Sequence, residues 1–341
     1  MRKFLVDLFD TAHGRLMKLA EAWQRHTNRR TILTAVFLGT TMATLYISVM
    51  RPPDGFPINE LVTIPEGAPL SEAAAVLEEA HIVRSGLVLK LLIILTGQEG
   101  NVHAGDYLFR EPKDVFAIAR TISIGAFGLE PIRFRVPEGA TAREMAAIFG
   151  ASLQRFDEQR FLANAQPLEG YLFPDTYFFR PNANDVLVLS TMRQNFEMKI
   201  QTLNGEIVMF GKPLRDVVVM ASLLEREAQK EEDRRKIAGV LWNRLERGML
   251  LQVDAAFLYT LGKGSFQLTV GDLTSDSPYN TYRHKGLPPG PIGSPSLDSL
   301  LAAVTPIKSD YLYYLADHNN ITHYSRTYEE HLRKKRQYLG T

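Results

Sequence analysis

The chain has 341 residues, with 39 Lys and Arg against 38 Asp and Glu, and it contains no cysteine. A net charge of +1 gives no sign of a nucleic-acid-binding protein, and the lack of cysteine excludes disulfides and thiolate metal sites. The length allows two or three domains, and 45% hydrophobic with 23% charged residues is ordinary for a folded protein. The charge is unevenly spread, because residues 1–51 carry a net +5 and leave −4 for the rest.

Residues 31–50 form an uncharged run of twenty residues, flanked by Arg30 and Arg51. This length suits one crossing of a bilayer, so a transmembrane helix is predicted there. The basic residues 1–30 predict a cytoplasmic tail, which places the bulk of the chain on the outer side of the membrane. The tail is expected either to lie on the inner membrane surface as an amphipathic helix or to have no role beyond orientation. A cleaved signal peptide is the competing interpretation.

An internal repeat follows a linker rich in proline and glycine at residues 51–58. Residues 62–68 (VTIPEGA) and 134–140 (FRVPEGA) each indicate a short strand and a Pro-Glu-Gly turn, followed by a helix. Residues 59–155 are therefore predicted to form a small strand–helix subdomain that resembles LysM-type carbohydrate-binding modules. A plain α/β packing unit without glycan contact is the alternative. Within it, a buried helix is expected at 83–96 and a returning strand at 103–109.

The remaining residues, 156–341, are predicted to form a mixed α/β domain, so the overall fold class is α+β. Helical periodicity and stop signals predict its secondary structure. Helices are expected over residues 185–203, 213–229, 233–247 and 327–339, and a strand over 311–316.

One stretch of this domain carries two carboxylates out of an apolar helix, residues 217–228 (VVVMASLLEREA). Glu225 directly follows two leucines, and a carboxyl group beside apolar surface resists ionisation. Such a group can hold a proton near neutral pH and donate it to a leaving group. Glu227 points about 160° away from Glu225 on a helix, so it is expected to position a neighbour or form a salt bridge. The plain alternative for Glu225 is a surface glutamate at a helix end.

Eight short motifs in this region occur in the order seen in a known family. Together they resemble the endolytic murein transglycosylases, the YceG-like (MltG) family, over roughly residues 60–340. The motifs are residues 169–177 (EGYLFPDTY), 221–227 (ASLLERE), 240–245 (VLWNRL), 251–254 (LQVD), 279–282 (YNTY), 286–292 (GLPPGPI), 311–317 (YLYYLAD) and 330–331 (EH).

The resemblance implies an enzyme that cleaves peptidoglycan between N-acetylmuramic acid and N-acetylglucosamine and leaves a 1,6-anhydro end. Glu225 matches the family's catalytic glutamate, with Glu227 in support. The polar and aromatic residues of the motifs are expected to bind the glycan, by stacking on sugar faces and bonding their hydroxyls and acetamides. These candidates are Glu169, Tyr171, Asn243, Gln252, Asp254, Tyr279, Asn280 and Tyr282. Core packing is the alternative for the aromatic residues, and bonding to an internal carbonyl is the alternative for Asn243.

The resemblance also implies a bacterial cytoplasmic-membrane protein that acts on newly made strands, with penicillin-binding proteins as partners. No cofactor or metal is expected, since the eight histidines form no His-x-x-x-His pair and no phosphate-binding glycine loop is present. A non-catalytic peptidoglycan-binding scaffold is the first alternative function. A muramidase that adds water is the second, and it would use a pair of carboxylates.

Overall fold

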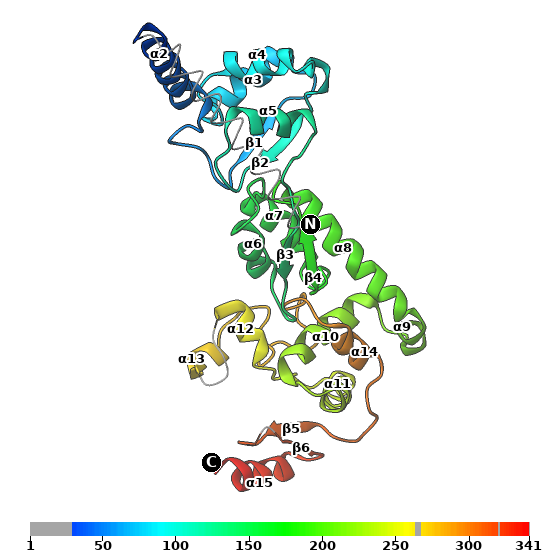
Figure 1. The fold of residues 1–341 in the computed structure, drawn as a ribbon. Helices are drawn as coiled ribbons and strands as arrows, with labels where there is room; N and C mark the ends of the chain where they lie inside the picture. Colours follow the sequence, from blue (N-terminus) through cyan, green and yellow to red (C-terminus); the bar gives the residue numbers. More distant parts are fainter. Residues whose placement is uncertain (1–28, 263–266, 320, 341) are drawn as a thin grey trace, which may run out of the picture. The chain divides into compact units, whose positions relative to one another are not determined.

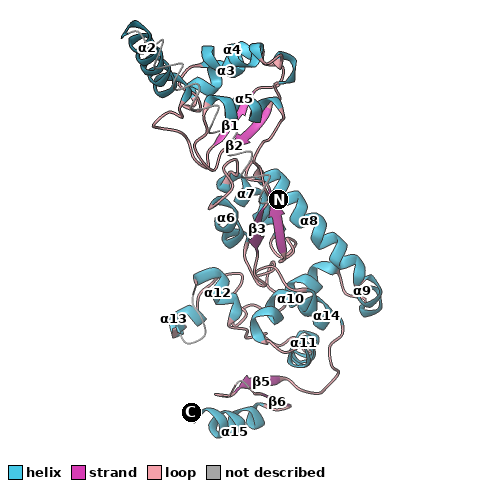
Figure 2. Ribbon diagram, in the orientation of Figure 1, coloured by secondary structure: helices cyan, strands magenta, loops and turns pink. Residues whose placement is uncertain are grey.

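The computed structural model describes residues 29–262, 267–319 and 321–340, which fall into two compact units, 1–128 and 129–341. The expected basic tail therefore lies almost wholly outside the described residues. Figure 1 follows the chain from end to end, and Figure 2 separates its helices from its strands. Helices dominate the described residues, and the six short strands found there form three antiparallel pairs, β1 with β2, β3 with β4, and β5 with β6.

The first unit begins with the helix Arg29–Met50, which is α-helical as α2 (Arg29–Leu45) and π-helical as η1 (Tyr46–Met50). Within the described residues it is the one helix long and apolar enough to cross a membrane, and none of its residues is buried. The rest of the unit comprises β1 (Leu61–Ile64), α3 (Leu70–Glu79), α4 (Gly86–Leu95), η2 (Glu99–Asn101), β2 (Gly105–Leu108) and α5 (Val115–Ser123).

The first copy of the repeat folds as strand, helix, helix, strand. Its two strands pair with Val62 opposite Tyr107, and α3 and α4 lie between them in the chain. Tyr107, Leu77 and Leu89 are fully buried in the core that these elements share. The strand expected at 103–109 is confirmed as β2, and the helix expected at 83–96 is confirmed as α4. That helix buries one face, with Leu89 and Ile93, and exposes the other.

The second copy has the same order, with α6 and α7 between β3 and β4, and it belongs to the second unit. Its strands pair with Phe134 opposite Tyr177 around a separate core. The turn glycines Gly67 and Gly139 have left-handed φ angles of 75° and 74°, which glycine adopts without steric cost. The compact units divide after residue 128, and not at the expected 155/156, because β3 pairs with a strand that begins only at Thr176.

The second unit is otherwise built around a buried helix, α10, which packs against α11 and α14. All eight residues from Val217 to Leu224 are buried. Its elements are β3 (Ile132–Arg135), α6 (Ala142–Gly150), α7 (Glu158–Ala165), η3 (Gln166–Leu168), β4 (Thr176–Phe179), α8 (Asp185–Thr202), α9 (Asn204–Phe210), α10 (Leu214–Glu227), α11 (Glu231–Glu246), α12 (Ala255–Leu261), α13 (Val270–Leu273), α14 (Leu297–Val304), β5 (Tyr313–Ala316), β6 (Thr322–Ser325) and α15 (Tyr328–Leu339). The helices predicted from residues 185, 213, 233 and 327 onward are confirmed as α8, α10, α11 and α15.

Two helical glycines of this unit test the packing of α11. A Cβ on Gly239 would lie 2.4 Å from the carbonyl oxygen of Ile307, whereas a Cβ on Gly205 in α9 meets nothing within 4 Å. Gly205→Ala should be neutral or stabilise by up to about 1 kcal/mol, because alanine favours a helix. Gly239→Ala should destabilise by about 1–3 kcal/mol through overpacking. Urea denaturation of the two variants measures the difference, and equal stability would contradict the packing of α11 described here.

Candidate active site

Helix α10 ends at a cavity that contains both carboxylates of the apolar stretch. Glu225 and Glu227 line this cavity of about 420 Å³ together with Glu138 and Asp233. The Glu225 side chain is only 5% exposed. Its carboxylate is therefore enclosed at the wall of a cavity and does not stand in open solvent.

The Glu225 carboxylate is held by two other helices. Arg234 of α11 donates from Nη2 to Oε1 at 3.1 Å, and the Arg234 side chain is itself only 9% exposed. Ser296 donates to Oε2 from both its backbone N–H, at 2.7 Å, and its hydroxyl, at 2.6 Å. Ser296 is also the N-cap of α14. The sequence predicted apolar surroundings for this group, but its two oxygens meet a cation and two polar donors.

Glu227 lies in a different set of contacts. Tyr314 of β5 donates its hydroxyl to Glu227 Oε2 at 2.8 Å. Burial of the carboxyl group raises the pKa of Glu227 to about 7; the tyrosine hydrogen bond opposes this rise and the charge of Asp254 adds to it. Asp254 in turn accepts the Tyr282 hydroxyl at 2.5 Å. The two glutamates thus have separate partners, as expected of residues two apart on a helix.

Glu138 reaches the same cavity from the Pro-Glu-Gly turn of the second repeat. This exposed residue sits at the cavity rim, where partial burial, followed by the negative charge of Glu225, raises its pKa. Two contacts of Gly139 fix this turn to later segments of the second unit. Its N–H donates to the Ser294 carbonyl at 2.8 Å, and its own carbonyl accepts Arg226 Nη2 at 2.7 Å.

A second cavity, of about 680 Å³, lies next to the first, because Arg226 lines both. Glu169 is in its wall and is 8% exposed. The N–H of Ala142, at the start of α6, donates to Glu169 at 3.2 Å, and the Tyr259 hydroxyl is 3.5 Å from it. Burial outweighs these hydrogen bonds and raises the pKa of Glu169 to about 7.

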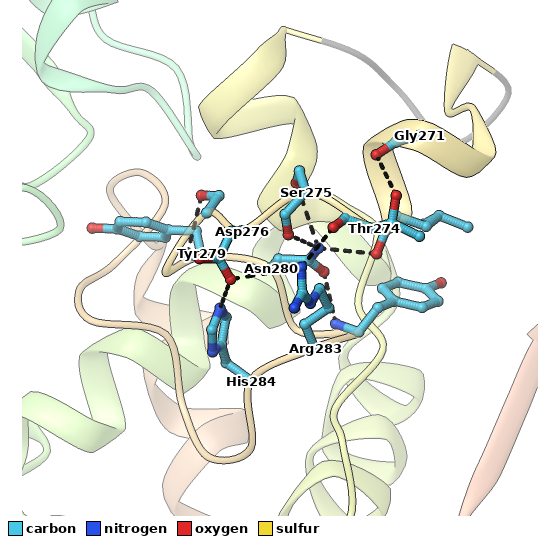
Figure 3. A network of polar contacts seen from close by, with 11 residues as sticks. Gly271, Thr274, Ser275, Asp276, Tyr279, Asn280, Arg283 and His284 are labelled. Carbon is cyan, nitrogen blue, oxygen red and sulfur yellow. Dashed lines mark hydrogen bonds and ion pairs between the residues drawn. The ribbon is translucent and has the colours of Figure 1, made fainter.

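Asn280, expected to bind sugar, holds its own loop together in this structure. It is 1% exposed, and its Nδ2 donates to the carbonyls of Leu273 and Ser275 at 3.0 and 2.7 Å. Its Oδ1 accepts the N–H of Tyr282 at 3.0 Å. Figure 3 shows Asn280 at the centre of this network, with Asp276 nearby. Its amide is therefore turned toward the main chain.

The other predicted binding residues also have structural partners. Asn243 donates to the carbonyls of Ser309 and Tyr311, which is the alternative that the sequence left open. The predicted residues and their partners are Gln252 with Arg244, Tyr171 with the Phe196 ring, and Tyr279 with the Tyr259 ring. Of the eight predicted residues, Asp254 and Tyr282 lie beside Glu227, and Glu169 lines the second cavity.

Sequence reasoning missed Glu138, which lines the first cavity, and three residues that hold its carboxylates, namely Arg234, Ser296 and Tyr314. The only signal for any of them was the repeated Pro-Glu-Gly turn, which marks Glu138. The structure brings the other three to α10 from later in the chain. Among residues 29–262, 267–319 and 321–340, no group of three His, Asp or Glu side chains is arranged to hold a metal ion.

Comparison with known proteins gives one consistent family. Residues 62–337 match the YceG-like family. An endolytic murein transglycosylase of Bacillus subtilis is 32% identical over 287 residues, which cover 76% of this chain and 79% of that protein. One of Streptococcus pneumoniae is 36% identical over 180 residues, 51% of this chain but only 33% of that protein. The crystal structure of a yceG-like protein from Listeria monocytogenes, 30% identical, matches with a TM-score of 0.54 over 81% of this chain and 99% of its own.

The buried carboxyl of Glu169 predicts a pH dependence of stability. Its pKa is about 7 in the folded protein against an ordinary 4.5, so the folded state binds more protons between these values. The free energy of unfolding should then fall as pH rises from about 4.5 to about 7. Glu169→Gln should remove part of this fall, because glutamine does not ionise. At pH 8 the free energy of unfolding of the variant should exceed that of the wild type by about 1–3 kcal/mol. Urea denaturation at pH 4.5 and pH 8 measures these free energies. If the change with pH is the same in the variant and the wild type, Glu169 is not the group responsible.

Proposed function

Because the chain belongs to the YceG-like family, we propose that it is a membrane-anchored endolytic transglycosylase of peptidoglycan. It cleaves the β-1,4 bond between N-acetylmuramic acid and N-acetylglucosamine, leaves a 1,6-anhydro end and terminates nascent glycan strands. The observation that carries this proposal is the carboxylate-lined cavity at the end of the buried helix α10. Relatives named endolytic murein transglycosylase support the same class of reaction.

In the proposed mechanism, Glu225 is the catalytic carboxyl group. Its acid form protonates the leaving oxygen of the glycosidic bond. The resulting carboxylate then takes the proton of the sugar's own O6 hydroxyl, which closes the 1,6-anhydro ring in place of water. Ser296 and Arg234 hold the carboxyl group in one orientation, so it is already aligned when the glycan binds.

Glu227 supports a second assignment of the proton donor. Its carboxyl group opens on the same cavity, and with a pKa of about 7 it carries a proton in a large fraction of molecules at neutral pH. In that assignment Glu227 gives the proton, and Glu225 stabilises the positive charge that develops on the sugar. The two assignments differ in which variant should lose more activity. Glu225→Gln should lose more in the first, and Glu227→Gln in the second.

The setting of the enzyme is part of the proposal. The helix Arg29–Met50 anchors the chain in the cytoplasmic membrane, with the amino terminus in the cytoplasm and the residues after the helix outside. The strand–helix repeat of residues 59–155 is proposed to contact glycan in the manner of LysM-type modules. Peptidoglycan strands are the substrate, and penicillin-binding proteins of the synthesis machinery are the proposed partners.

A water-using muramidase is the second candidate function. Glu138 and Glu227 join Glu225 at one cavity, and a pair of carboxylates is what hydrolysis with water requires. The masses of the products distinguish the two reactions, because an anhydro end is lighter than a reducing end by one water. A non-catalytic scaffold would bind peptidoglycan and release neither product.

Glu225→Gln should lower the rate of digestion of purified peptidoglycan by at least about 100-fold, because the proton donor is lost. Glu227→Gln keeps an acceptor for Tyr314 and should lower the rate less, while removing the ionisation near pH 7 from the pH–rate profile. Chromatography with mass analysis of the released fragments measures both effects.

Glu225→Gln also leaves Arg234 as an unpaired buried charge, which costs about 3–5 kcal/mol in such pairs. The double variant Glu225→Gln with Arg234→Gln removes both charges and serves as the folding control. It should be folded and inactive. A folded double variant with wild-type activity, or a larger loss in Glu227→Gln than in Glu225→Gln, would move the proton-donor role away from Glu225.

The two repeat turns offer a matched pair of substitutions. Gly67→Ala and Gly139→Ala should each cost about 1–2 kcal/mol of stability, because both glycines are left-handed. A Cβ at 139 would also lie 3.2 Å from Arg226 Nε and 3.5 Å from Glu225 Cγ, whereas a Cβ at 67 meets nothing within 4 Å. Only Gly139→Ala should therefore slow peptidoglycan cleavage, in assays below the melting temperatures of both variants. Equal activity would show that the second turn does not shape the site.

A further inference from the structure

We propose that the outward face of α4 docks on the surface of the bilayer that holds the helix Arg29–Met50. This inference rests on the membrane anchor proposed above. It adds an interaction surface, defined here as the α4 stripe, and names lipid as its partner. The stripe consists of Leu87, Leu91, Ile94 and Leu95.

The α4 stripe is apolar and uncovered along the whole helix. Its four side chains are 66%, 49%, 38% and 83% exposed in chain order. Their spacing of i, i+4, i+7 and i+8 places them on one face about 100° wide. The opposite face, with Leu89 and Ile93, is fully buried in the core of the first unit. A helix that is apolar on both faces is expected to be covered on both.

The neighbouring helix α3 shows that an apolar exterior is not general in this unit. Its outward positions include Ser71, Glu72, Ala75 and Glu79, and all four are exposed. Helices α3 and α4 pack against each other and share one core. The same unit therefore presents a polar helix face and an apolar one.

The start of α4 is tied to the chain that leaves the proposed membrane helix. Met50, the last residue of that helix, packs against the core of the unit. Arg84 donates from Nε to the Pro52 carbonyl at 3.2 Å and from Nη2 to Asp54 at 3.1 Å. Helix α4 begins two residues later, at Gly86, and its ten residues span about 15 Å. The whole stripe thus lies within a short reach of the point where the chain emerges.

This tether decides what covers the stripe. A surface held beside the bilayer meets lipid at a high effective concentration, so modest burial of leucine side chains is enough for contact. Lys90 is half-buried beside the stripe, and its ammonium group can extend toward anionic headgroups while its stem stays on apolar surface. An apolar stripe with a flanking lysine is the pattern of a helix that lies in a membrane interface.

The lack of native cysteine allows a direct test on the full-length chain. Single variants Leu91→Cys and Leu95→Cys are labelled with an environment-sensitive fluorophore and reconstituted in liposomes that contain anionic lipid. Nitroxide-labelled lipids then report contact by quenching. Ala75→Cys in α3 is the polar-face control, and Phe37→Cys in α2 is the control for the anchor.

Labels at 37, 91 and 95 should be quenched several-fold more than the label at 75, with blue-shifted emission. Quenching at 37 together with a response at 91 and 95 like that at 75 would overturn this inference and leave the anchor standing. Shielding of 91 and 95 from aqueous iodide without lipid quenching would assign the stripe to a protein contact and also overturn it. Absence of quenching at 37 would refute the anchor, and the inference with it.

Discussion

The buried ion pair between Glu225 and Arg234 is the interaction on which the rest of the second unit depends. Both side chains are nearly enclosed, at 5% and 9% exposure, so neither charge has water to replace its partner. Ser296 adds two donors to the same carboxylate. Helices α10, α11 and α14 therefore meet at one group. The packing of these helices and the orientation of that carboxylate cannot change independently, which makes the site as rigid as the core behind it.

The internal repeat serves two different purposes in one chain. Both copies fold as strand, helix, helix, strand, and both turn through a left-handed glycine. The first copy closes around its own core in the first unit. The second copy is joined to α10 through Gly139, and so its Glu138 stands at the cavity. The equivalent Glu66 in the first copy is exposed as well, but it does not line this cavity. One local sequence pattern thus gives one local fold, while distant contacts decide whether its glutamate can meet a substrate.

The same distinction explains how much the sequence could predict. Helices α8, α10, α11 and α15 were found within two residues, because periodic apolar positions and stop signals are local. The partners of the two glutamates were not predicted, because they are distant in sequence. Ser296 lies 71 residues after Glu225, and Tyr314 lies 87 residues after Glu227. Asn243 and Asn280 were expected to bind sugar because amides can do so. In the fold their amides satisfy main-chain carbonyls, a need that buried carbonyls always have and that no local pattern reveals.

The end of α10 places two carboxyl groups of unlike surroundings at one cavity. Glu227 is enclosed and bonded to a tyrosine, and its pKa near 7 lets it hold a proton at neutral pH. The Glu225 oxygens receive a guanidinium and a hydroxyl, which fix them as acceptors in the unliganded protein. Ring closure on a sugar's own hydroxyl first requires a proton given and then a proton taken. A glycan that displaces Ser296 from Glu225 would free one oxygen for both steps, whereas a glycan that leaves this bond intact would need the proton of Glu227. In the proposed reaction, the bond between Ser296 and Glu225 therefore decides whether Glu225 gives the proton itself or Glu227 gives it while Glu225 stabilises the charge on the sugar.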